Sequence, residues 1–174
     1  MSIFDPLEKE QRAHTYRMFA YLFTDVPDED LIEEFEDFAG ITVADTYEEI
    51  CDDFINLFSE ASLPNYEGYY REQIYRDIPI DLSLNDVQHF YWSAGITLEE
   101  EFDLPPDHIS IELLFMSYLI EENLIDLQID FLRRLSEWIP LFCDYLYEKA
   151  NTDFYKEVAT ALKEFVLSEC GGYS

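Results

Sequence analysis

The residues best suited to chemistry in this sequence lie in one short stretch, residues 103–109, where an Asp-His pair follows two prolines. Asp103, Asp107 and His108 place two carboxylates and one imidazole on a turn that the prolines make rigid. A long apolar helix pattern begins directly after the turn, so these groups are expected beside an apolar surface. Such a set could carry acid–base or metal chemistry, or it could bind a basic partner.

Other catalytic and metal-binding patterns are missing from the sequence. Its three histidines form no HxxxH or HExxH pair, and the single pair Asp86-x-x-His89 falls short of the two Glu-x-x-His pairs of a di-iron bundle. There is no GxSxG, GxGxxG or Walker sequence. We therefore expect no catalytic residue, no metal and no cofactor, and we predict that the protein is not an enzyme. A small helical enzyme that uses His108 and carboxylates stays open as an alternative.

His108 also has a structural interpretation. Its side chain could pair with Asp107, or with Glu112 one helical turn further on, and so fix the start of the next helix. Asp107 would favour a helix N-terminus in any case, because a negative charge complements the helix dipole there. The sequence leaves open whether this pair faces a partner or supports the fold.

Composition limits the classes of partner. The 174 residues include 39 Asp and Glu against 10 Lys and Arg, for a formal net charge of −29, and 48% of them are hydrophobic. This charge repels phosphate backbones and anionic membrane surfaces, so we expect no nucleic-acid binding. It would attract a basic peptide, although plain solubility or a salty cytoplasm explains the same charge. The hydrophobic content is too high for a disordered acidic tail.

The cysteines and the N-terminus favour a cytoplasmic protein. Cys51, Cys143 and Cys170 are odd in number and widely spaced, which argues against a disulfide framework or a zinc site. The N-terminus lacks the basic region and apolar stretch of a secretory signal, and no run of about 18 apolar residues occurs. We therefore predict a cytoplasmic location without stable membrane insertion.

The elements that position the turn are expected to be helices. No stretch shows sustained period-two alternation, so no strand is predicted. Residues 63–80 should form a loop with a helical piece, and a helix should run from about Pro106 to Glu122. Residues 125–147 have a helical pattern that contains Pro140, so we expect a kink or a break near residues 137–139. Helix starts and stops are indicated by Asp5-Pro6, Thr46, Ser83 and Asn151, and by Gly40 and Gly95.

These patterns predict an all-α protein. The whole chain, residues 1–174, should form a single-domain helical bundle of roughly seven to nine helices. Aromatic residues near the turn could line an apolar groove, or they could be ordinary core. We expect core for Phe90 and Phe115, and we favour a partner-facing patch for Tyr70, Trp92 and the Asp107-His108 pair. The full aromatic group is Tyr66, Tyr69, Tyr70, Tyr91 and Trp92, beside Pro105-Pro106.

Several motifs, taken in chain order, resemble those of the TorD/DmsD/NarJ family of chaperones. Residues 103–108 are similar to the family's acidic-x-Pro-x-Asp-His signature. Three positions depart from the family pattern: Asp103 replaces the usual Glu, Gly68 replaces a Ser, and Arg134 or Leu135 falls where many members have a His. The other matching motifs are Phe19-Ala20-Tyr21-Leu22-Phe23, Leu57-Phe58, Pro64 to Tyr70, Val87 to Gly95, Glu112 to Met116, Trp138-Ile139-Pro140 and Phe154-Tyr155.

The resemblance implies a cytoplasmic chaperone that holds the precursor of a molybdenum oxidoreductase catalytic subunit. Family members bind the twin-arginine signal peptide or the N-terminus of that subunit until the molybdopterin cofactor is loaded. Asp103 and Asp107 would pair with the arginines, and aromatic side chains would cover the apolar part. Carried over by position, the peptide site would comprise Tyr70, Trp92, Asp103, Pro105, Asp107 and His108.

The resemblance leaves the client enzyme and the oligomeric state open. Family members exchange helices between subunits, so the chain would be a monomer or a helix-swapped homodimer, with a plausible hinge near residues 99–103. A generic acidic helical adaptor that binds proteins is the alternative function.

Overall fold

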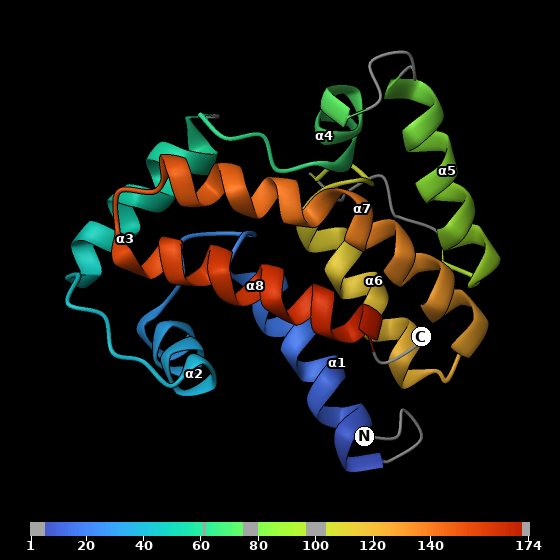
Figure 1. Cartoon of the computed structure of the whole chain (residues 1–174), viewed down its shortest axis with the longest axis horizontal. Helices are drawn as coiled ribbons and strands as arrows, with labels where there is room; N and C mark the ends of the chain where they lie inside the picture. Colours follow the sequence, from blue (N-terminus) through green and yellow to red (C-terminus); the bar gives the residue numbers. More distant parts are fainter. Residues whose placement is uncertain (1–5, 61, 75–79, 97–103, 172–174) are drawn as a thin grey trace.

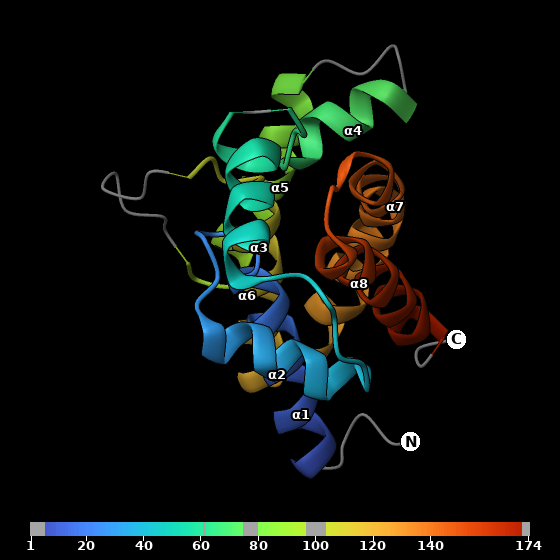
Figure 2. The same cartoon turned by 90° about the vertical axis from the view of Figure 1, so that its left-hand side faces the viewer.

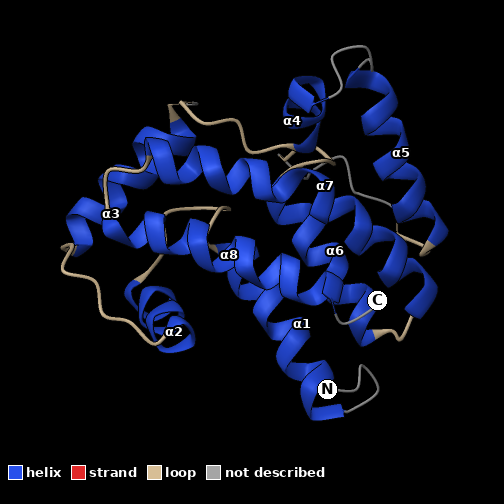
Figure 3. Ribbon diagram, viewed as in Figure 1, coloured by secondary structure: helices blue, strands red, loops and turns tan. Residues whose placement is uncertain are grey.

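The computed structural model describes residues 6–60, 62–74, 80–96 and 104–171. Within these ranges the chain forms eight α-helices and one short π-helical segment, and no strand, which confirms the all-α prediction (Figure 3). The elements are α1 (Pro6–Tyr21), α2 (Glu29–Ala39), α3 (Tyr47–Phe54), the π-helical segment (Ile55–Ser59), α4 (Glu67–Ile74), α5 (Ile80–Ser93), α6 (Ile109–Glu121), α7 (Ile125–Lys149) and α8 (Asp153–Gly171).

Two helix pairs form the body of the molecule. Helix α1 packs on α6, and α7 packs along α8, as both views show (Figures 1 and 2). Nearly every side chain of α6 is buried, so this helix is central. Helices α2 and α3 lie at one end of the long axis, and α5 lies at the other (Figure 1). The turn that contains Pro105 and Pro106, called the proline turn below, precedes α6 and lies near α4 and α5.

Aromatic side chains fill the core. The Phe115 ring lies 4.7 Å from that of Tyr91 and 4.8 Å from that of Phe131, which confirms its predicted core position. Phe90 is half-buried and packs on Phe131 at 5.2 Å.

None of the described helices is long and apolar enough to cross a membrane.

Local capping signals set several helix ends as predicted. The Glu49 N–H donates to Thr46 Oγ1 at 3.1 Å, and the Thr46 N–H donates to Glu49 Oε1 at 2.9 Å, which completes a capping box at the start of α3. Gly40 ends α2 with a φ of 69°, a left-handed conformation that glycine adopts without a Cβ clash.

Two predicted helix starts were wrong, and Pro140 does not end its helix. Helix α5 begins at Ile80, so the start predicted at Ser83 lies inside it. Helix α7 continues through Pro140, so no break occurs there, and a kink at that position stays a prediction. Trp138, Ile139 and Phe142 are fully buried around that position, and their packing outweighs the loss of one backbone hydrogen bond. Helix α6 begins at Ile109 rather than near Pro106, because His108 is its N-cap.

Candidate functional site

The proline turn is joined to the start of α4 by backbone hydrogen bonds. The Glu67 N–H donates to the Asp107 carbonyl at 2.9 Å, and the Ile109 N–H donates to the Asn65 carbonyl at 2.8 Å. The Tyr91 hydroxyl donates to the Pro106 carbonyl, which ties α5 to the same turn. The turn therefore fixes the positions of α4, α5 and α6 relative to one another.

Asp107 supports the first turn of α4. Its carboxylate accepts the Gly68 N–H at 2.9 Å, and only 3% of the residue is exposed. This position suits a carboxylate because the exposed N–H groups of a helix start carry partial positive charge. Burial nevertheless raises the pKa of Asp107. The side chain is thus engaged inside the protein and does not face solvent.

His108 caps α6. Its Nδ1 accepts the Ser110 N–H at 3.0 Å, and 3% of the residue is exposed. An accepting Nδ1 requires a neutral ring with its proton on Nε2. Burial lowers the pKa of His108 to about 4, which keeps the ring neutral near pH 7. His108 therefore does fix a helix start, although its partner is the Ser110 backbone rather than Asp107 or Glu112.

A buried cluster of charged side chains lies behind the turn. Glu67 is fully buried and pairs with Arg71 one helical turn on. Arg134 of α7 also binds Glu67, through Nε at 2.9 Å and Nη2 at 2.8 Å. A buried charge is stable only when it is paired in this way. The Glu67–Arg71 spacing is a sequence signal for part of the cluster, whereas no local pattern connects Glu67 with Arg134.

Glu112 completes this cluster as a neutral acid. Its Oε1 accepts the Trp138 indole N–H at 3.1 Å, and the side chain is fully buried. Burial, and then the charge of Glu67, raise the pKa of Glu112 well above its usual range. Glu112 Oε2 is buried without a hydrogen-bond partner among the described residues, and a proton on it can be donated to the neighbouring Glu67 carboxylate. The contacts of Glu67 and Glu112 with Arg71, Arg134 and Trp138 hold α4, α6 and α7 together.

A known protein family matches the part of the chain that contains the proline turn. The model of the nitrate reductase delta subunit matches residues 25–144, more than half of the chain, and that span includes the proline turn. The chain belongs to this family. The nitrate reductase delta subunit family consists of maturation chaperones of molybdoenzymes, which confirms the resemblance to the TorD/DmsD/NarJ chaperones. No curated protein matches the chain.

In this delta-subunit family member, the predicted peptide-site residues divide into two groups. Tyr70 is fully buried with Asp107 and His108; its hydroxyl donates to the Pro64 carbonyl at 2.6 Å, and its ring stacks on Trp138. Trp92, by contrast, is 62% exposed, and Pro105 is exposed as well. Asp103 lies outside the described residues. The structure thus separates side chains that support the turn from those that a partner can reach.

The rest of the predicted aromatic group follows the same division. Tyr91 is buried, whereas Tyr66 and Tyr69 are half-buried. Their rings meet edge to face, with centroids 6.5 Å apart. These half-buried rings present part of their surface beside the start of α4.

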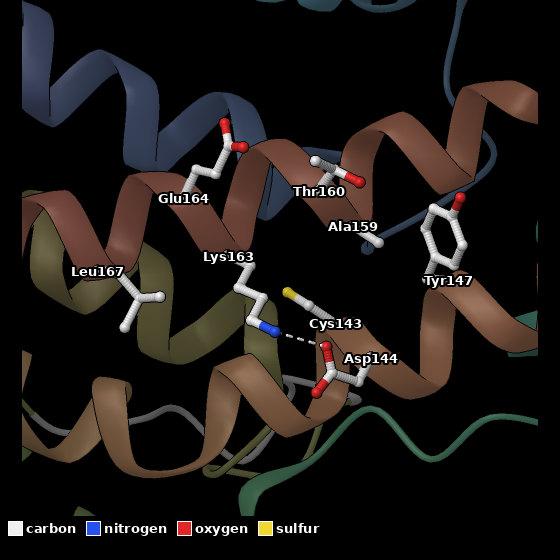
Figure 4. A pocket seen from close by; sticks show the side chains of 8 residues that line it. All are labelled: Cys143, Asp144, Tyr147, Ala159, Thr160, Lys163, Glu164 and Leu167. Atoms are coloured by element: carbon white, nitrogen blue, oxygen red, sulfur yellow. Dashed lines mark hydrogen bonds and ion pairs between the residues drawn. The ribbon is translucent and has the colours of Figure 1, made fainter.

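A pocket of about 340 Å³ lies between α7 and α8 (Figure 4). Tyr147 and Leu167 lie at its two ends, and the Lys163 ammonium pairs with Asp144 at 2.8 Å. Burial raises the pKa of the Cys143 thiol far above its usual range, so this thiol is a poor nucleophile. No histidine lines the pocket.

The described part of the chain contains no group of three or more His, Cys, Asp or Glu side chains arranged to hold a metal ion. Its three cysteines are free thiols.

Proposed function

We propose that this chain is a cytoplasmic chaperone that binds the N-terminal segment of a molybdopterin-containing oxidoreductase subunit and holds it until the cofactor is inserted. The bound segment is a twin-arginine signal peptide or a basic-apolar N-terminus without one. Membership of the nitrate reductase delta subunit family carries the proposal. The net charge of −29 supports it, because such a field attracts a basic segment and speeds its encounter.

The exposed side chains around the turn are the proposed contact for the apolar part of the segment. Trp92 offers the most exposed large apolar side chain among the described residues, and Pro105 lies on the turn to which α5 is tied. Tyr70, Asp107 and His108 contribute from inside, because they position the helices that carry this surface. Asp103 remains a proposed partner for an arginine.

Titration calorimetry with a synthetic leader tests this function. The leader carries two adjacent arginines followed by an apolar stretch, and it is titrated into the full chain at low and high salt. Wild type should bind it, more weakly at high salt because screening reduces the electrostatic attraction. Trp92→Ala should weaken binding about tenfold, as for an aromatic residue at the centre of an interface.

Tyr147→Ala is the matched control, because Tyr147 is 51% exposed and belongs to the α7–α8 pocket, away from the turn. This control should bind as wild type does. Equal binding of a leader without arginines would favour the generic adaptor, and no binding of any basic-apolar segment would refute the proposed function.

A further inference from the structure

A hollow of about 310 Å³ lies between α2, the following loop and α3. Its apolar floor is formed by Ile32, Val43 and Ile50. In Figure 1 these helices occupy the end of the molecule opposite α5, so the hollow is separate from the surface around Trp92. Its volume is at the lower limit of ligand pockets, roughly 300–1,000 Å³, so it suits one or two inserted side chains rather than a helix.

Four carboxylates surround the hollow. Glu36 and Asp45 are positioned by backbone bonds: Glu36 Oε2 accepts the Val43 N–H at 2.9 Å, and Asp45 Oδ2 accepts the Phe154 N–H at 2.8 Å. Each of these two keeps a second oxygen for a ligand. Glu29 and Glu33 are exposed, and their side chains can swing to meet a cation.

The stretch of sequence that forms this rim contains no basic residue. Residues 18–70 contain fifteen Asp and Glu and not one Lys, Arg or His. None of the ion pairs within the described ranges involves the four rim carboxylates. Because neighbouring like charges repel one another, a bound cation relieves that repulsion as well as gaining its own pairing energy.

Tyr47 adds an aromatic face to the rim. Its side chain is 42% exposed and lines the hollow. A guanidinium can stack on such a ring while its planar N–H groups bind carboxylates in pairs, whereas a lysine ammonium is a point charge without this fork. A rim of carboxylates and one ring above an apolar floor therefore fits arginine better than lysine.

We propose that this acid-rimmed hollow receives the arginine-bearing part of the client's leader. The inference rests on the proposed function and deepens it by locating the arginine contact. It moves that contact away from Asp107, whose carboxylate is buried and already accepts the Gly68 N–H. The apolar part of the leader is left to the surface around Trp92.

The test compares three leaders that differ only in the residue pair: two arginines, two lysines or two glutamines. The double variant Glu29→Gln/Glu33→Gln removes two rim charges. It should weaken the arginine leader about tenfold or more, the loss of roughly one charge-assisted pair. The matched control, Glu148→Gln/Glu157→Gln, removes two charges from exposed positions on α7 and α8 and should change binding less than about threefold.

A Tyr47→Leu variant tests the ring separately, and it should reduce the preference for arginine over lysine. Equal losses in the rim variant and the control would overturn the inference, because the general field alone would then attract the leader. A wild-type complex that Trp92→Ala weakens and the rim variant leaves unchanged would also overturn it, while the proposed function would stand. Absence of wild-type binding to every leader would overturn both.

Discussion

The carboxylates near the proline turn are paired inside the protein, whereas those at the α2–α3 end lie around a hollow without ion-pair partners among the described residues. Behind the turn, buried Glu67 is paired with Arg71 and Arg134, and Asp107 binds a backbone N–H. At the α2–α3 end, the rim carboxylates face a hollow and pair with no described cation. The first arrangement stabilises the fold, whereas the second leaves charge available for a partner.

The residues that form the most distinctive sequence motif are therefore different from the residues that a partner can reach on the surface. The Asp-His pair is the most distinctive motif of the sequence, yet both side chains are buried and hold helix starts. Among the residues that a partner can reach, Trp92 lies in the matching stretch Val87 to Gly95, whereas Glu33 lies in none of the matching motifs. Variants at the two regions should therefore fail in different ways, by unfolding at the turn and by loss of binding at the hollow.

The largest expected effect is at Arg134. Arg134→Met removes one partner of buried Glu67, which should lower the free energy of unfolding by about 3 kcal/mol while Arg71 still compensates in part. Urea unfolding at pH 7 measures this change. The neighbouring Arg133→Met provides the control, because Arg133 is exposed and its loss should cost at most about 0.5 kcal/mol. Similar losses in both variants would contradict a structural role for the buried cluster.

The next effect is a pH dependence at His108. The unfolded imidazole takes up a proton below about pH 6.5, whereas the folded one, with its pKa lowered to about 4, stays neutral until lower pH. The unfolded state therefore binds more protons between these values. Stability due to His108 is fully present above pH 6.5 and falls by about 3 kcal/mol as the pH drops to 4.

His108→Asn isolates this contribution, because Asn is a good N-cap that does not titrate. Denaturant unfolding from pH 7 to pH 4 should show the variant gaining about 3 kcal/mol relative to wild type. The measurement to compare is the free energy of unfolding of the variant minus that of wild type. Asp107 and Glu112 have raised pKa values and add stability to both proteins as the pH falls, so this contribution cancels. A constant difference across this range would show that His108 is not held neutral.

A smaller effect is expected at Asp107. Asp107→Ala leaves the buried Gly68 N–H without an acceptor, which should cost about 2 kcal/mol. Asp107→Asn keeps an acceptor oxygen and should cost less. Hydrogen exchange of the Gly68 amide, measured together with global unfolding, should show faster local opening in the alanine variant. Equal exchange rates of the Gly68 amide in both variants would contradict the view that the Asp107 side chain stabilises the start of α4.

The smallest expected effect on stability is at the hollow. Glu29→Gln/Glu33→Gln should change the free energy of unfolding by no more than about 0.5 kcal/mol, because both side chains are exposed and lack described ion-pair partners. A thermal melt beside wild type measures this. A large loss of stability would show that the carboxylates of the hollow stabilise the fold, as those near the proline turn do.

Local sequence signals predicted the helices well where the contacts that form them are also local. Thr46 and Glu49 are three residues apart, and Gly40 needs only its own backbone freedom, so capping rules found both ends. At Pro140 the local rule allowed a break that does not occur, since the packing of its neighbours carries α7 through it. The turn lies directly before α6, as its prolines predicted, and the peptide site there stays a prediction; the burial of its side chains was not foreseeable from local spacing.

The sequence by itself determined the all-α class, the acidic field and the family, because composition, helical periodicity and ordered motifs are properties of the chain. Only the tertiary structure decided that Asp107 and His108 point inward, that Arg134 meets Glu67 across 67 positions, and that α2 and α3 enclose a hollow. The physical reason is that burial and charge pairing depend on which helices meet in space. Residues far apart in sequence decide those contacts.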